Sequence, residues 1–219
     1  MTLRKILMKH LILALPLLAL AGLPANAAEK EQPKPAAGKM AGRVTLEQAL
    51  ADKVLGKKDA PITILAFESL TCPHCASFHR NTLPQLKKEY IETGKAKLIF
   101  IDYPLDGRAM LASMLARCSG DERFFAIVEM LFGSQQTWGR AQDVMGELGR
   151  IGRFGGMTAE EFKSCMANKA LFDGIRKRQL AADKAHSIRS TPTFVINGKK
   201  LLGAQPFAEF DKIMKPMVK

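Results

Sequence analysis

The chain of 219 residues has little of several features that mark particular classes of protein. It contains no apolar run of the roughly 20 residues that cross a bilayer, and it has no internal repeat. Its 33 Lys and Arg are scattered among 21 Asp and Glu, with no long basic block and no interleaved aromatic residues. We therefore interpret the formal net charge of +12 as solvated surface and not as a nucleic-acid site. These absences exclude a multi-span membrane protein and disfavour a polyanion-binding protein.

What is present is the composition of an ordinary globular domain. Apolar residues make up 47% of the chain and charged residues 25%, values that exclude a disordered chain and a collagen. Aromatic residues are sparse at 7%, and there are four cysteines. The length fits one domain better than two.

The first 27 residues have the three zones of a secretory signal peptide. These zones are a positively charged start, an apolar run at 11–23 and small residues at 25–27. The apolar run is too short to span the roughly 30 Å of membrane hydrocarbon, which argues against an anchor. We predict cleavage after Ala27 or Ala28 and export to a bacterial periplasm, where disulfides persist.

Residues 28–43 combine Pro, Gly, Ala, Lys and Glu without apolar periodicity, and they are predicted to form a disordered tether. The folded domain is predicted at 44–219. Apolar runs at 61–68 and 96–103 predict two strands. Between them a helix is expected from Pro73, a residue suited to a first helical position, to about Thr93. A strand–helix–strand unit of this kind predicts a parallel pair.

The middle of the chain, about 107–188, contains no convincing strand, and its apolar residues recur at helical spacing. Thr158 with Glu161 is the sequence of a capping box, which starts one of these helices. Strands are expected next at 193–196 and 199–202, because Asn197-Gly198 between them is a strong hairpin turn. A last helix is predicted from Pro206 to about Met214. The fold class is therefore α/β with a helical insertion.

The most informative feature of the sequence is Cys72-Pro73-His74-Cys75, at a predicted strand-to-helix junction. The free amides and the dipole of a helix N-terminus favour negative charge, and His74 is a positive or hydrogen-bonding neighbour. Both effects lower the pKa of Cys72 and make it the exposed, attacked sulfur. Cys75, one turn further along, is turned toward the body of the fold and is interpreted as the resolving sulfur.

Two less reactive interpretations of the Cys pair were weighed. A structural zinc site needs four Cys or His ligands, usually in paired clusters, and Cys118 and Cys165 are isolated. An inert disulfide over so short a loop would constrain the unfolded chain only weakly.

With Thr191-Pro192-Thr193 before the predicted hairpin, the motif resembles the DsbA-like thiol–disulfide oxidoreductases of the thioredoxin-fold superfamily. The resemblance covers about residues 54–216. Cys-Pro-His-Cys is typical of the oxidising members. Ser-Leu-Thr before it and Pro104-Leu105-Asp106 after the second strand are similar to the alphaproteobacterial branch.

The resemblance implies a thioredoxin-like sheet, a cis Pro192 that faces the Cys pair, and a Thr191 backbone that binds extended substrate as an added strand. The best-known members have Val before this proline. Thr191 differs from them, because its hydroxyl can form hydrogen bonds toward the sulfurs, as in isomerases and other branches.

Glu68, four residues before Cys72, is a candidate buried carboxylate that shuttles the proton of Cys75. The resemblance places the acid at position 66, which is Ala here, and a solvated Glu68 stays open as the alternative. His79 is interpreted as a helix-surface residue and His186 as a local structural one. Trp138 and the methionines of the helical block are interpreted as core residues, with a peptide groove as the alternative.

Cys118 and Cys165 lie on apolar faces of two neighbouring predicted helices. In an oxidising compartment this favours a structural Cys118–Cys165 bridge, with buried free thiols as the alternative. The resemblance to alphaproteobacterial members with a second disulfide agrees with the bridge.

The resemblance implies that the chain introduces disulfides into newly exported proteins, with no organic cofactor and no metal. A membrane partner of the DsbB type, linked to quinone, would reoxidise the Cys pair. Two alternatives stay open: a disulfide isomerase or reductase, and a periplasmic metal-binding or holdase protein with an incidental CxxC.

Overall fold

The structure, a computed structural model, describes residues 39–40 and 44–218. The predicted signal peptide and most of the predicted tether lie outside these residues. Lys39–Met40 (β1) pairs antiparallel with Val44–Thr45 (β2). Regular structure therefore starts inside the segment predicted as tether, because pairing with β2 supplies backbone hydrogen bonds that its composition does not indicate.

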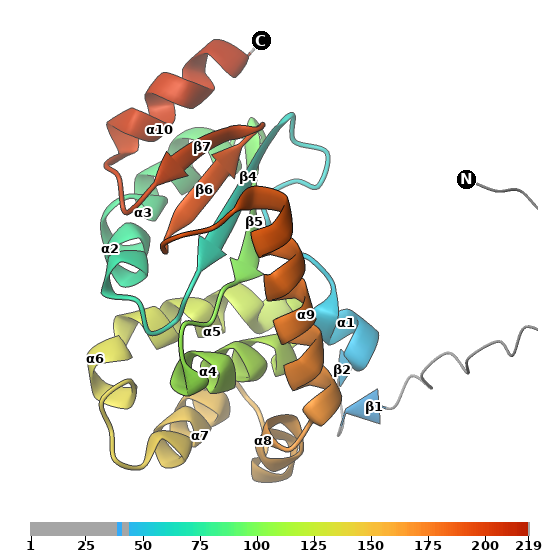
Figure 1. The fold of residues 1–219 in the computed structure, drawn as a ribbon. Helices are drawn as coiled ribbons and strands as arrows, with labels where there is room; N and C mark the ends of the chain where they lie inside the picture. The colour runs from blue at the N-terminus through green and yellow to red at the C-terminus, as the bar shows by residue number, and fades with distance from the viewer. Residues whose placement is uncertain (1–38, 41–43, 219) are drawn as a thin grey trace, which may run out of the picture. The chain divides into compact units, whose positions relative to one another are not determined.

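A mixed sheet of five strands, in the order β3-β5-β4-β6-β7, forms the centre of the described domain (Figure 1). The strands are Lys53–Leu55 (β3), Ile62–Glu68 (β4), Ala96–Asp102 (β5), Thr193–Ile196 (β6) and Lys199–Leu202 (β7). The parallel β4–β5 pair and the β6–β7 hairpin confirm the predictions. Strand β3 was not predicted, because it is too short to show a strand period; it lies antiparallel to β5.

Successive residues of β4 face opposite sides of the sheet. Ile64 and Ala66 belong to the main core, whereas Phe67 packs with Ile188 on the other face. Glu68 follows the alternation of Ile64 and Ala66, which places a carboxylate at the main-core face of the sheet.

The helix after β4 is interrupted. Pro73–Asn81 (α2), Leu83–Leu86 (α3) and the π-helical turn Lys87–Ile91 (η1) replace the single helix predicted to about Thr93. Pro84 has no N–H to bond the carbonyl four residues earlier. At the break, the hydroxyl of Thr82 donates to the carbonyl of Gln205 at 2.8 Å.

Helices fill the chain between β5 and β6 and confirm the helical insertion (Figure 1). They are Gly107–Cys118 (α4), Asp121–Gly133 (α5), Gln135–Trp138 (α6), Val144–Phe154 (α7), Ala159–Met166 (α8) and Lys169–His186 (α9). The capping box predicted at the start of α8 is present. The remaining helical segments are Leu46–Leu50 (α1), Phe207–Met214 (α10) and the 3-10 turn Lys215–Met217 (η2).

The helical insertion shares the main hydrophobic core with the sheet and contains a disulfide. Trp138 is fully buried and donates from Nε1 to the carbonyl of Leu131 at 2.7 Å, which matches its interpretation as a core residue. Among the methionines, Met145 is exposed. A disulfide joins Cys118 at the end of α4 to Cys165 in α8, 47 residues later. No helix in the described part of the chain is long and apolar enough to cross a membrane.

Candidate active site

The two remaining cysteines lie at the start of α2. Cys72 is the N-cap residue, Pro73 occupies the first turn, and Cys75 lies within that turn. Both thiols are free in the structure. Cys72 is 7% exposed and Cys75 is fully buried. The prediction of an exposed Cys72 therefore holds only relative to Cys75, because Thr191 packs over the Cys72 sulfur.

The environment shifts the pKa values of the two thiols in opposite directions. A hydrogen bond from the Cys75 side chain, with further donors from Thr191 and the backbone, lowers the pKa of Cys72 to about 5 against the cost of burial. Burial raises the pKa of Cys75 far above its usual range, and the hydrogen bond with Cys72 and the charge of Glu68 add to this. Near neutral pH, Cys72 is therefore a thiolate and Cys75 a thiol.

His74 contributes to this electrostatics through its backbone. Its N–H is one of the donors that lower the pKa of Cys72. The residue itself is exposed on the first turn of α2. The effect of the imidazole on the thiolate stays a prediction.

The loop before β6 faces the Cys pair. The bond Thr191–Pro192 is cis. The sulfur of Cys72 lies 3.3 Å from the carbonyl oxygen of Thr191, to which it donates when the thiol is protonated. Thr191 Oγ1 is buried and has no hydrogen-bond partner among the described residues. Its hydroxyl is a donor near the Cys72 sulfur, and this proximity contributes to the lowered pKa of Cys72. The structure thus brings Thr191 and Pro192 to the sulfurs.

Glu68 is buried, with 1% of its surface exposed, so the solvated alternative is wrong. Its Oε2 lies 2.9 Å from Nε2 of His79, and its Oε1 has no partner among the described residues. The interpretation of His79 as a surface residue is also wrong, because its side chain is 6% exposed. The packing of α2 against α5 buries it, and its ring centroid lies 4.2 Å from that of Phe132.

Two residues of the helical block hold the loop that carries Cys72, and the sequence analysis assigned neither a role there. Gln135 Nε2 donates to the carbonyl of Leu70 at 2.8 Å and to the carbonyl of Cys72 at 3.0 Å. Asp106 Oδ2 accepts from the hydroxyl of Thr71 at 2.7 Å. Asp106 could be recognised from the sequence as a helix N-cap, at the start of α4. No local sequence pattern indicates that Gln135 binds the Cys72 loop.

The other candidates lie apart from the sulfurs. His186, at the end of α9, packs against Phe67 and accepts from Lys200 through its carbonyl, in agreement with a local structural role. Within residues 39–40 and 44–218, no cluster of three or more His, Cys, Asp or Glu is arranged to hold a metal ion.

Comparison with known proteins agrees with this geometry. A family model described as Thioredoxin matches residues 48–216. The crystal structure of alpha-DsbA1 from Wolbachia pipientis is 32% identical, with a TM-score of 0.71, over 75% of this chain and 89% of that chain.

Curated relatives carry related names. A Rickettsia bellii protein named as a protein-disulfide oxidoreductase is 33% identical over 71% of this chain, and the match spans 61% of that protein's length. Disulfide bond formation protein D of Bacillus subtilis is 27% identical, over 76% of this chain and 75% of that protein. The present chain belongs to the thioredoxin family, as one of its DsbA-like members.

Proposed function

We propose that the chain is a thiol:disulfide oxidoreductase that introduces disulfides into exported proteins. The observation that carries this proposal is the geometry at the start of α2, where Cys72 is the N-cap beside the Thr191 carbonyl and Cys75 is fully buried, so that the pKa values of the two thiols shift in opposite directions. A stabilised Cys72 thiolate favours the reduced pair over its disulfide, so the disulfide is a strong oxidant. The printed names of the relatives support the same class of reaction.

In the reaction, a substrate thiolate attacks Cys72 and breaks the Cys72–Cys75 bond. Cys75 leaves as a thiolate and takes up a proton, because its pKa lies far above neutral pH. A second substrate thiolate then attacks the substrate sulfur of the mixed disulfide. Cys72 leaves as a stable thiolate, the substrate carries the new disulfide, and one proton passes to solvent.

Residues around the sulfurs take distinct parts in this scheme. The backbone of Thr191 lies against Cys72 and is suited to bind an extended substrate beside the attacked sulfur. Buried Glu68, which raises the pKa of Cys75, exchanges the proton of that thiol. His74 and Pro73 shape the helix start that presents Cys72.

The compartment and the partner follow from the same proposal. The pattern of residues 1–27 supports export to the periplasm, where reduced polypeptides arrive unfolded. The reduced pair then needs an electron acceptor, and a membrane partner of the DsbB type linked to quinone would supply it.

The test is oxidation of a dithiol peptide by the purified oxidised protein, combined with equilibration against glutathione. We expect stoichiometric peptide oxidation and a reduction potential above that of thioredoxin, roughly −270 mV. Cys72→Ser should abolish the oxidation. A potential at or below the thioredoxin value would overturn the oxidase assignment and favour a reductase or isomerase.

A further inference from the structure

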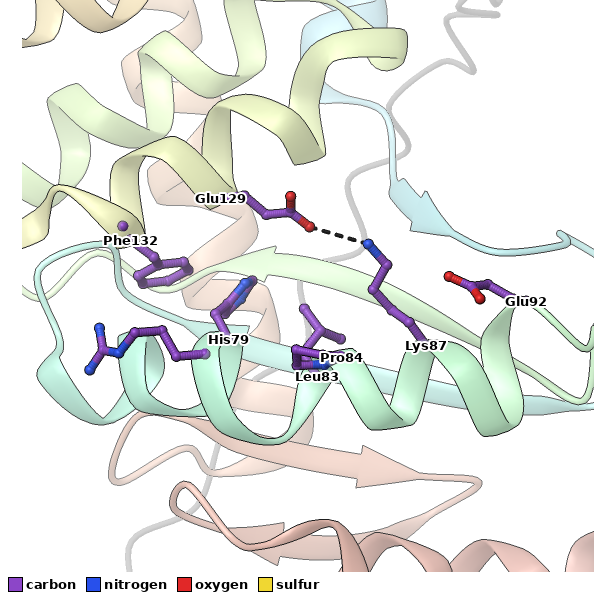
Figure 2. A pocket seen from close by; sticks show the side chains of 9 residues that line it. His79, Leu83, Pro84, Lys87, Glu92, Glu129 and Phe132 are labelled. Atoms are coloured by element: carbon purple, nitrogen blue, oxygen red, sulfur yellow. Dashed lines mark hydrogen bonds and ion pairs between the residues drawn. The ribbon is translucent and has the colours of Figure 1, made fainter.

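A cavity of about 520 Å³ lies between α2–η1 and α5, away from the loop that carries Thr191. Figure 2 shows His79 rising from α2 into this space beside Phe132, with Lys87 and Glu129 paired across the cavity. His79 is thus shared by two environments, because its Nε2 contacts buried Glu68 and its ring lines the cavity.

Two atoms of this pair lack partners. His79 Nδ1 and Glu68 Oε1 are buried and have no hydrogen-bond partner among the described residues. A buried polar atom without a hydrogen-bond partner lowers stability, so such atoms call for an explanation. An imidazole with one nitrogen on a buried carboxylate, in a side chain that also lines a cavity, is suited to relay protons.

We infer that His79 carries protons between Glu68 and the solvent of this cavity. Cys75 then exchanges its proton on the cavity side of α2 and not on the side where Thr191 would bind substrate. This inference rests on the proposed function. His79 acts through Glu68 and does not touch the reacting sulfurs.

The proton balance can be written for reoxidation by oxidised glutathione. The Cys72 thiolate attacks the glutathione disulfide, forms a mixed disulfide and releases one glutathione thiolate. Cys75 then gives its proton to Glu68 and attacks Cys72, which closes the protein disulfide and releases the second glutathione thiolate. In the tautomer that carries its proton on Nδ1, His79 accepts the proton of Glu68 at Nε2 and releases the Nδ1 proton to the cavity.

The charges around the pair come from β5, α4, α2, η1 and α5. Asp102 of β5 is the register partner of Glu68, and its carboxylate is paired with Arg117 of α4 at 2.6 Å. The charged residues that line the cavity with His79 are Arg80, Lys87, Glu92 and Glu129. Lys87 and Glu129 are paired at 3.3 Å and largely cancel in charge, which leaves Arg80 and Glu92 as the other charged residues of the lining.

The experiment follows closure of the Cys72–glutathione mixed disulfide in a single turnover, by acid quench and mass spectrometry between pH 5 and pH 9. His79→Gln retains a side chain that can hydrogen-bond to Glu68 in either protonation state of the carboxyl, but it cannot relay a proton. We expect closure to slow by about 10²-fold, the lower end of general acid–base effects, while formation of the mixed disulfide stays at the wild-type rate. His186→Gln is the matched control, because this histidine packs on the other face of the sheet.

A second variant distinguishes a proton relay from a purely structural effect of losing His79. His79→Ala enlarges the cavity, and added imidazole should restore its closure rate by about tenfold or more. The same imidazole should leave Glu68→Gln unchanged. Equal slowing of formation and closure, absence of rescue, or His79→Gln closure within about twofold of wild type would each overturn the relay. Failure of the wild-type protein to oxidise a dithiol peptide would instead overturn the proposed function.

Discussion

The low pKa of Cys72 makes a prediction about stability that can be measured without any substrate. A group whose pKa is depressed on folding stabilises the native state above its unfolded pKa, and this contribution is lost as the pH falls through the folded pKa. For Cys72 the folded pKa is about 5, and the unfolded value is about 8.5–9. The reduced protein should therefore lose stability on acidification from pH 7 to pH 4.

The expected size follows from the shift. At pH 7 the folded pKa lies two units below the pH, which corresponds to about 2–3 kcal/mol in favour of the reduced fold. At pH 4 the contribution is close to zero. For a domain of this size, the melting temperature should change by about 5–10 °C. Cys75 adds almost nothing in this range, because its pKa is raised in the folded state and is about 8.5–9 in the unfolded chain, so that it is protonated in both.

The assay is thermal melting of the reduced protein, the oxidised protein and Cys72→Ser between pH 4 and pH 8. The oxidised form and Cys72→Ser carry the same carboxylates and histidines but no Cys72 thiolate, so they set the baseline. The same free energy makes the couple about 60 mV more oxidising at pH 7. A constant difference in melting temperature between reduced wild type and reduced Cys72→Ser over this pH range would refute the reasoning.

Three further predictions concern single features of the site and its support. Limiting alkylating reagent at pH 7 should label Cys72 before Cys75, which peptide mapping checks, and preferential labelling of Cys75 would reverse their roles. The double variant Cys118→Ala, Cys165→Ala should lose roughly 3–4 kcal/mol of stability for a 47-residue loop yet still oxidise a dithiol peptide. Gln135→Leu leaves the Leu70 carbonyl unbonded and removes one of the two bonds to the Cys72 carbonyl, which keeps the bond from the Ala76 N–H; this should cost about 1–3 kcal/mol and slow peptide oxidation. Unchanged melting and turnover in that variant would contradict the positioning role.

The parts of the fold that could be predicted from the sequence are those set by local pattern. The strands at 62–68 and 96–102 were visible as apolar runs, and the hairpin followed from Asn197-Gly198. The break in the helix after Cys75 was not predicted, although Pro84 is its local cause. Proline also fits the first turn of a helix, so its presence alone does not distinguish an interrupted helix from two successive ones.

The residues of the candidate site could likewise be predicted only where a local pattern marks them. Cys72 and Cys75 could be found because their chemistry and their helix start lie within four residues. The Glu68–His79 pair could not, because it depends on which face of α2 is buried against α5. That choice comes from the packing of Phe132 against His79, 53 residues apart in the chain, and no local pattern encodes it.

The contacts of the helical insertion explain why losing its disulfide should reduce stability and leave turnover intact. The bridge joins α4 to α8, and in the described residues neither helix supplies a bond to the carbonyls of Leu70 and Cys72. Those bonds come from Gln135 in α6, which is tied to α4 by the donation from Arg108 Nη1 to the carbonyl of Gly139 at 2.7 Å. Removing the bridge releases the unfolded chain from a constraint but leaves these native hydrogen bonds in place. The geometry of the Cys72 loop therefore depends on Gln135 more than on the disulfide.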